Sequence, residues 1–126
     1  LARVYYRSGG DRAVAHARAL AAGIEEEGLL DPSREPRLRA LVAREQSIHA
    51  LATIEVLDPD ARPLLAMFRG ADSPAPASAS DAALVASVKA GQAPVRVEGE
   101  GASDVLRGAA AVRGEGGALA AVVIVD

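Results

Sequence analysis

The side chains best suited to chemistry in this chain are two histidines and a set of arginines near predicted strands. Cysteine is absent, so a disulfide, a thiolate metal site and a cysteine nucleophile are all excluded. His16 and His49 lie in different predicted helices, and neither stands near a pair of acidic residues at ligand spacing. Because a zinc site needs three or four converging ligands, we expect no metal and no cofactor.

The remaining motifs do not assemble a catalytic centre. Ser47 and His49 are two residues apart on a predicted helix, so they do not face each other. A nucleophilic site would need nucleophile, base and orienting acid within hydrogen-bond reach. Gly99-Glu100-Gly101 lies between predicted strands, whereas a phosphate-binding loop leads from a strand into a helix. We therefore expect no enzymatic activity from the chain itself.

Four arginines, Arg69, Arg96, Arg107 and Arg113, lie on or beside predicted strands. The planar guanidinium group binds carboxylates well, so one or two of them could converge on a small anionic ligand. The alternative is that they are solvated side chains on the outer face of the sheet. We select Arg69, Arg96, Arg107 and His49 as candidate ligand-binding residues, because His49 would respond to pH if it bordered a pocket.

The charge of the chain is nearly balanced, since 14 basic and 17 acidic residues give a formal net charge of −3. Because the basic residues do not cluster, we expect no nucleic-acid partner. No stretch approaches the ~18 apolar residues of a membrane span. The chain starts at Leu1 without a signal peptide, and we expect it to be a piece of a longer protein.

The elements that must position these residues begin with helices. Apolar residues from Ala13 to Ile24 recur at spacings of three and four, which predicts a helix that stops at Gly28. Ser8-Gly9-Gly10 is a weak point before it, with Asp11 as the expected N-cap. Pro36 suits the first turn of a second helix. One face of it carries Leu38, Leu41, Val42, Glu45, Ile48, His49 and Ala52. Two of these positions are polar, so we expect part of this face to meet something other than plain core.

From Thr53 onward the apolar period changes to two, which predicts strands. We expect strands at 53–57, 63–69, 95–98, 104–112 and 118–125, and a short helix at 81–89 between Asp81 as its cap and Gly91. The last strand is apolar on both faces, so it should be central and covered on both sides. The predicted fold is α+β with one antiparallel sheet of about five strands. It is a single domain, with helices in 1–52 and the sheet in 53–126.

The first predicted hairpin resembles that of extracytoplasmic PAS-like sensor domains of the PDC or Cache type. Those domains belong to bacterial membrane histidine kinases and chemoreceptors. The resemblance is carried by Thr53-Ile54-Glu55-Val56-Leu57-Asp58, a polar turn and Pro63-Leu64-Leu65-Ala66-Met67, with Ala61 where glycine is common. The pair formed by 108–112 and 118–126 resembles the two strands that lead to the second membrane span of those proteins.

The resemblance implies a PAS-like five-stranded sheet with a long N-terminal helix and a second helix packed on it. It also implies a homodimer formed through the N-terminal helix, whose alanines would allow close approach, and flanking transmembrane segments. The expected location is periplasmic, with a ligand pocket between the sheet and the segment that joins its second and third strands. Citrate sensors of this group carry an Arg and a His together on the second strand, and Arg62-Pro63-Leu64-Leu65 lacks the histidine. A citrate-like ligand is therefore not indicated.

We predict the signal-sensing domain of a membrane-bound two-component histidine kinase, which passes a shift to a cytoplasmic output domain. The alternative from a different class is a cytoplasmic protein-interaction module of the roadblock or longin type. Those modules also build a five-stranded sheet with helices, but they usually continue into another helix after the last strand. A small enzyme with an unfamiliar site is the third interpretation.

Overall fold

The computed structural model describes residues 2–51, 53–68, 79–91, 95–98 and 105–125. It describes their side chains except at 2–11, 68, 79–81, 95–98, 105–106 and 115. The helices are α1 (Ala2–Glu27), α2 (Glu35–Ile48) and α3 (Ala79–Lys89), with 3-10 turns at Pro32–Arg34 and Glu115–Gly117. The strands are β1 (Thr53–Leu57), β2 (Pro63–Phe68), β3 (Val95–Glu98), β4 (Val105–Arg113) and β5 (Leu119–Val125).

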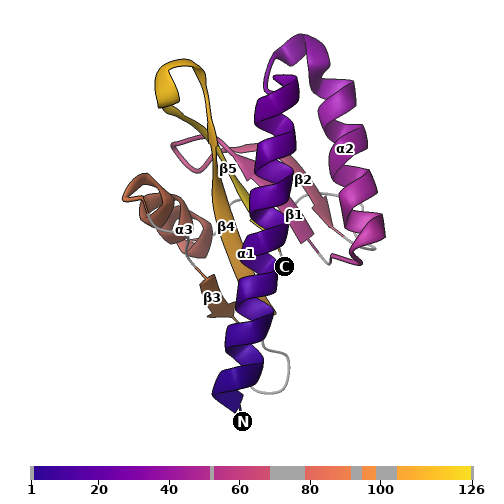
Figure 1. Cartoon of the computed structure of the whole chain (residues 1–126). Helices are drawn as coiled ribbons and strands as arrows, with labels where there is room; N and C mark the ends of the chain where they lie inside the picture. The colour runs from indigo at the N-terminus through magenta and orange to yellow at the C-terminus, as the bar shows by residue number, and fades with distance from the viewer. Residues whose placement is uncertain (1, 52, 69–78, 92–94, 99–104, 126) are drawn as a thin grey trace.

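All five strands form one antiparallel sheet in the order β2-β1-β5-β4-β3. The predicted α+β class with an antiparallel sheet is thereby confirmed. The central place predicted for the last strand is also confirmed, because Ala121–Val125 are fully buried between β1 and β4. Two helices cover one face of the sheet and the third covers the other (Figure 1).

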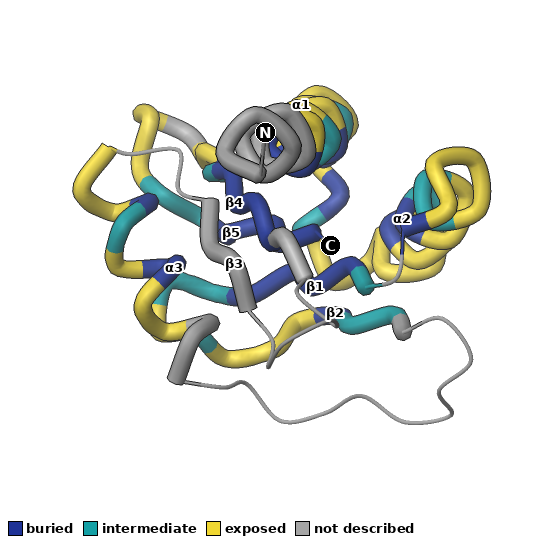
Figure 2. The backbone as a smooth tube through the Cα atoms, turned by 90° about the horizontal axis from the view of Figure 1, so that it is seen from below, coloured by how far each residue is buried: buried dark blue, intermediate teal, exposed yellow. Residues whose placement is uncertain are grey.

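Two apolar cores follow from these layers (Figure 2). The larger core lies between the sheet and α1 and α2, and it contains Ile54, Val56, Val123 and Val125. The smaller core lies under α3, and its members are Leu57, Leu84, Val85, Val88, Ala109, Val122 and Ile124. Alternate residues of β5 thus enter opposite cores, as the two-residue period of a strand requires.

Helix α1 packs unusually closely on β4. Ala13, Ala17 and Ala21 are buried against the sheet, and Gly108 of β4 lies directly under the α1 backbone. A Cβ atom at position 108 would lie 2.5 Å from the Val14 nitrogen, so only glycine fits there without displacement of the helix. Ala13, Ala17 and Ala21 therefore pack within the chain, whereas Ala15 and Ala19 on the same helix are exposed.

The first residues of helices α1 and α3 differ from the sequence predictions. Helix α1 runs unbroken from Ala2, so Asp11 is not an N-cap. Glycine costs a helix only about 1 kcal/mol per residue, which a continuous helix tolerates more easily than two new ends. Helix α3 begins at Ala79, so Asp81 lies inside it and not before it. The stop at Gly28 is confirmed, because its φ of +61° suits glycine after a helix.

Helix α2 is less buried than its sequence pattern predicts. Leu38 and Val42 are buried, but Ile48 is 60% exposed and the helix ends there. Ala50, with φ of 52°, then turns the chain toward β1. The predicted face is therefore interrupted at Ile48, where the helix ends, and Ala52 lies outside the described residues.

Candidate functional site

His49 follows the last residue of α2, and its ring meets that of His16 on α1. The ring centroids are 4.3 Å apart and the planes are tilted by 39°. Glu45, one turn earlier on α2, places Oε2 3.1 Å from His49 Nε2. The two histidines predicted to be separate thus form one cluster with a single carboxylate between the helices.

Burial is the main cause that lowers the pKa of His16 below its ordinary value of 6.5. The neighbouring His49 and then Arg12 lower this pKa further, whereas Glu45 raises it. Protonation of His16 is therefore disfavoured in the folded chain. Sequence reasoning selected His49 as the pH-responsive group and did not anticipate this lowered pKa of His16.

Arg107 of β4 is buried on the face of the sheet that α3 covers. Its Nη2 atom lies 3.2 Å from Oε2 of Glu55 on β1, and both side chains are about nine-tenths buried. Ala109 and Leu57, two residues further along each strand, belong to the core under α3, so the pleat places Arg107 and Glu55 on that same face. The guanidinium is engaged in a structural ion pair.

Of the four residues selected from the sequence, the structure describes the side chains of His49 and Arg107, and these two do not converge. His49 packs against α1 on one side of the sheet, whereas Arg107 points to the other. Arg96 of β3 pairs with Arg107 in the backbone register, and its side chain is not among those described. Arg69 lies outside the described residues. The two described side chains, His49 and Arg107, therefore do not share a ligand site.

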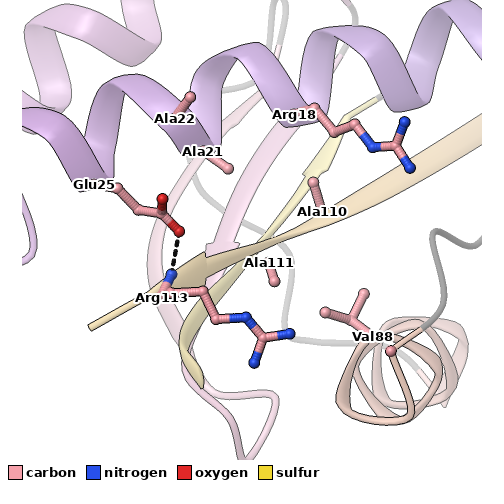
Figure 3. Close-up of a pocket in the computed structure, with 9 residues that line it drawn as sticks. Arg18, Ala21, Ala22, Glu25, Val88, Ala110, Ala111 and Arg113 are labelled. Atoms are coloured by element: carbon pink, nitrogen blue, oxygen red, sulfur yellow. Dashed lines mark hydrogen bonds between the residues drawn. The ribbon is translucent and has the colours of Figure 1, made fainter. Parts of the chain in front are cut away.

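A cavity of about 350 Å³ lies instead between α1, the end of β4 and the end of α3 (Figure 3). Its floor is made of small side chains, Ala21 and Ala22 of α1 with Ala110 and Ala111 of β4. Arg18, Glu25 and Arg113 supply its charged groups, while Val88 of α3 and Gly91, which follows that helix, complete the lining. The small floor residues leave the room that the arginine side chains border.

The charged side chains of this cavity differ in the hydrogen bonds that they make. Glu25 Oε1 accepts a hydrogen bond from the backbone N–H of Arg113, which ties α1 to β4 (Figure 3). The Arg113 Nη1 atom makes a long hydrogen bond of 3.5 Å to the Gly117 carbonyl. Arg18 is exposed and forms no hydrogen bond or ion pair within the described part of the chain. With two guanidinium groups and one carboxylate, the cavity has an excess of positive charge that favours a small anionic group.

A second cavity of about 450 Å³ shares Glu25 and Arg113 and extends toward the α1–α2 connection. Ile24, Leu30, Val112 and Ala120 give it a mostly apolar wall. Glu25 and Arg113 thus stand where the two cavities meet. A ligand there would contact both the helix and the β4–β5 hairpin.

Sequence reasoning missed Arg18 and Glu25, and it mentioned Arg113 without selecting it. Glu25 belongs to the acidic run 25–27, which the sequence presents as a poorly placed helix end. Its role depends on Arg113, 88 residues further along. The one available signal was that a carboxylate at the end of a helix is unfavourable for the helix dipole and so needs a partner.

The described residues contain no group of three or more His, Asp or Glu side chains that could hold a metal ion. Among these residues, no helix combines the length and the apolar character needed to cross a membrane. No protein-family model and no curated protein matches the chain.

Proposed function

We propose that this chain is the signal-sensing domain of a membrane-bound bacterial histidine kinase and lies on the periplasmic side of the membrane. The observation that supports the proposal best is the contact between the backbones of α1 and β4 at Gly108. Because backbone atoms cannot rotate away as side chains can, a displacement of β4 must move α1 with it. Such rigid coupling is what a domain needs if it transmits a small shift.

The two ends of the described chain also favour transmission. The start of α1 and the end of β5 lie toward the same end of the sheet (Figure 1). Val125 at the end of β5 belongs to the core that α1 covers. A shift of the sheet would therefore reach both connections on one side of the domain, where a membrane-bound protein would have its two spans.

The finer fold assignment belongs to the same proposal. A five-stranded antiparallel sheet in the order 2-1-5-4-3, with a 26-residue helix before it, is compatible with a PAS-like domain. The Asp58 turn of the first hairpin adds support. Asp58 Oδ1 accepts hydrogen bonds from the backbone N–H groups of Asp60 and Arg62 at 2.8 and 2.9 Å. This turn belongs to the hairpin that carries the sequence resemblance.

A ligand of this sensor, in our proposal, occupies the cavity between α1 and β4 (Figure 3). A small organic acid would place its carboxylate between Arg18 and Arg113, as the planar guanidinium favours. Because Glu25 and the Arg113 backbone join the helix to the strand at the same place, occupancy would change the helix–strand contact. A ligand shifts such an equilibrium only through different affinities for the two states.

A homodimer through α1 remains part of the proposal. Ala13, Ala17 and Ala21 are buried against the sheet, whereas Ala15 and Ala19 are exposed on the opposite side of the helix. The outer alanines would allow close approach of a second α1.

The test of location uses the gene that encodes the whole protein, truncated after Asp126 and fused to alkaline phosphatase or to β-galactosidase. A periplasmic domain gives active phosphatase and inactive galactosidase. The opposite pair of activities would overturn the proposal and favour the cytoplasmic interaction module. The gene should also encode apolar spans of ~20 residues on both sides of this domain.

The test of coupling uses the full-length kinase in membranes and measures its autophosphorylation. Gly108→Ala should change the basal rate, because it displaces α1 from β4. Gly23→Ala is the matched control, since its Cβ would meet only Leu41 Cδ2 at an ordinary 3.5 Å. Equal rates in the wild-type protein and both variants would contradict transmission through this contact.

A further inference from the structure

The two histidines of this chain meet where the C-terminal end of α2 lies against α1. Their rings are in contact at 4.3 Å between centroids, and the His49 side chain is 37% exposed. Water can therefore exchange protons with the cluster, although the rings are partly enclosed. Contact between two groups that can each become cationic makes this junction sensitive to the number of protons it holds.

The charges that face the cluster come from both helices. Glu45 of α2 is the single carboxylate, 3.1 Å from His49 Nε2, and Arg12 of α1 adds a fixed positive charge near His16. A proton on His16 would place a positive charge against the His49 ring and beside Arg12, and Glu45 is the carboxylate that compensates it. The charges around this contact therefore oppose protonation of His16.

The buried apolar side chains of helix α2 lie toward its N-terminal end. Its buried residues, Leu38 and Val42, lie in the first eight positions of the helix. Arg37 there forms an ion pair of 3.1 Å with Glu27 at the end of α1. Near the histidine cluster Ile48 is exposed, and Gln46 donates a long 3.4 Å hydrogen bond to the Met67 carbonyl. Repulsion at the histidines therefore acts on the less buried half of α2.

We propose that the His16–His49 contact is an acid-sensitive junction, and that protonation of His16 moves the C-terminal half of α2 away from α1. The first half of α2 stays in place and acts as the pivot. The junction lies away from the cavity between α1 and β4 and does not depend on the sensory role proposed above. If that role is correct, the junction adds protons as a second signal.

The first test is an NMR titration of the histidine ring protons, which is simple because the chain has only two histidines. The His16 midpoint should lie below 6.5 in the wild-type chain. His49→Gln should raise it and Glu45→Gln should lower it further, because the first removes a positive charge and the second removes the negative one. Glu26→Gln, an exposed change elsewhere on α1, is the control and should leave it unchanged. If the midpoint of the His16 pH titration were the same in all four proteins, the proposed junction would be contradicted.

The second test measures movement by dipolar EPR between spin labels, which can be placed cleanly because cysteine is absent. Labels at the exposed positions of Ala15→Cys and Ser47→Cys report the junction, and labels at Glu26→Cys and Ala40→Cys report the pivot. From about pH 8 to about pH 5, a range that spans the ordinary histidine pKa, the first distance should lengthen or broaden. The second should not change, and His16→Gln should abolish the response.

Each other outcome of the EPR test counts against the proposal. If neither distance changes although His16 becomes protonated, the junction does not open. If both distances change together, acid unfolds the whole helical layer and the pivot is wrong. If the response persists in His16→Gln, another group drives it. Circular dichroism of each variant at about pH 8 establishes that it is folded before the comparison.

Discussion

Replacement of Gly108 by alanine tests the central feature of this fold, the contact between the α1 and β4 backbones. The added Cβ would lie 2.5 Å from the Val14 nitrogen and 2.6 Å from the Ala13 carbonyl carbon. Ordinary contacts begin near 3.4 Å, so α1 must move away by about 1 Å. A gap of that size forfeits roughly a quarter to a half of the dispersion energy of each contact that it opens.

The expected cost follows from comparable changes in packed cores. Overpacking typically costs about 1–3 kcal/mol and occasionally more, and here the obstacle is backbone that cannot rotate away. Removal of a strand glycine offsets about 0.5–1 kcal/mol of this cost. We therefore expect Gly108→Ala to lower the free energy of unfolding by about 2 kcal/mol. Urea unfolding followed by circular dichroism measures it.

The matched control is Gly23→Ala on α1, where the new Cβ makes only an ordinary contact with Leu41. It should raise the free energy of unfolding by about 0.5–1 kcal/mol, as expected for glycine to alanine inside a helix. Ala13→Gly added to Gly108→Ala should restore little, because the closest contacts are with backbone atoms. A Gly108→Ala protein as stable as the wild type would refute the reasoning.

Three further predictions concern stability measured in the same way. Arg107→Met should lower the free energy of unfolding by about 3 kcal/mol, since it leaves Glu55 buried without this ion pair. The double variant with Glu55→Met should lose less free energy than the sum of the two single changes. Strict additivity would show that the two side chains are not energetically coupled. Ala61→Gly should raise the free energy of unfolding by about 0.5–1 kcal/mol, because Ala61 has φ of 63° in the Asp58 turn and glycine adopts this conformation without strain. A lower free energy of unfolding would show that the positive φ of Ala61 causes no strain. The third concerns pH: because folding lowers the pKa of His16, the folded state binds fewer protons, and stability falls as pH drops below about 6.5. His16→Gln should weaken this dependence between about pH 7.5 and pH 5.5 relative to the wild type, and an unchanged slope would contradict the assignment.

Local pattern was sufficient to predict most elements of this fold. The three- and four-residue spacing of Ala13 to Ile24, the stop at Gly28 and the two-residue period from Thr53 each depend on neighbours in the sequence. The apolar run of β5 even indicated its central place, because a strand without a polar face must be covered on both sides. Hydrophobic burial imposes these patterns directly.

The sites, by contrast, were decided by tertiary structure. Arg107 looked available for a ligand until the sheet placed Glu55, 52 residues away, against it. Glu25 and Arg113 are 88 residues apart and meet only because α1 lies across β4.

Sequence by itself thus determined which residues prefer helix, strand or core, since those preferences act over a few neighbouring residues. Only the folded chain decided which charges meet, because the energy of an ion pair depends on distance and burial. For the same reason His16 and His49, which lie far apart in the sequence, form one cluster.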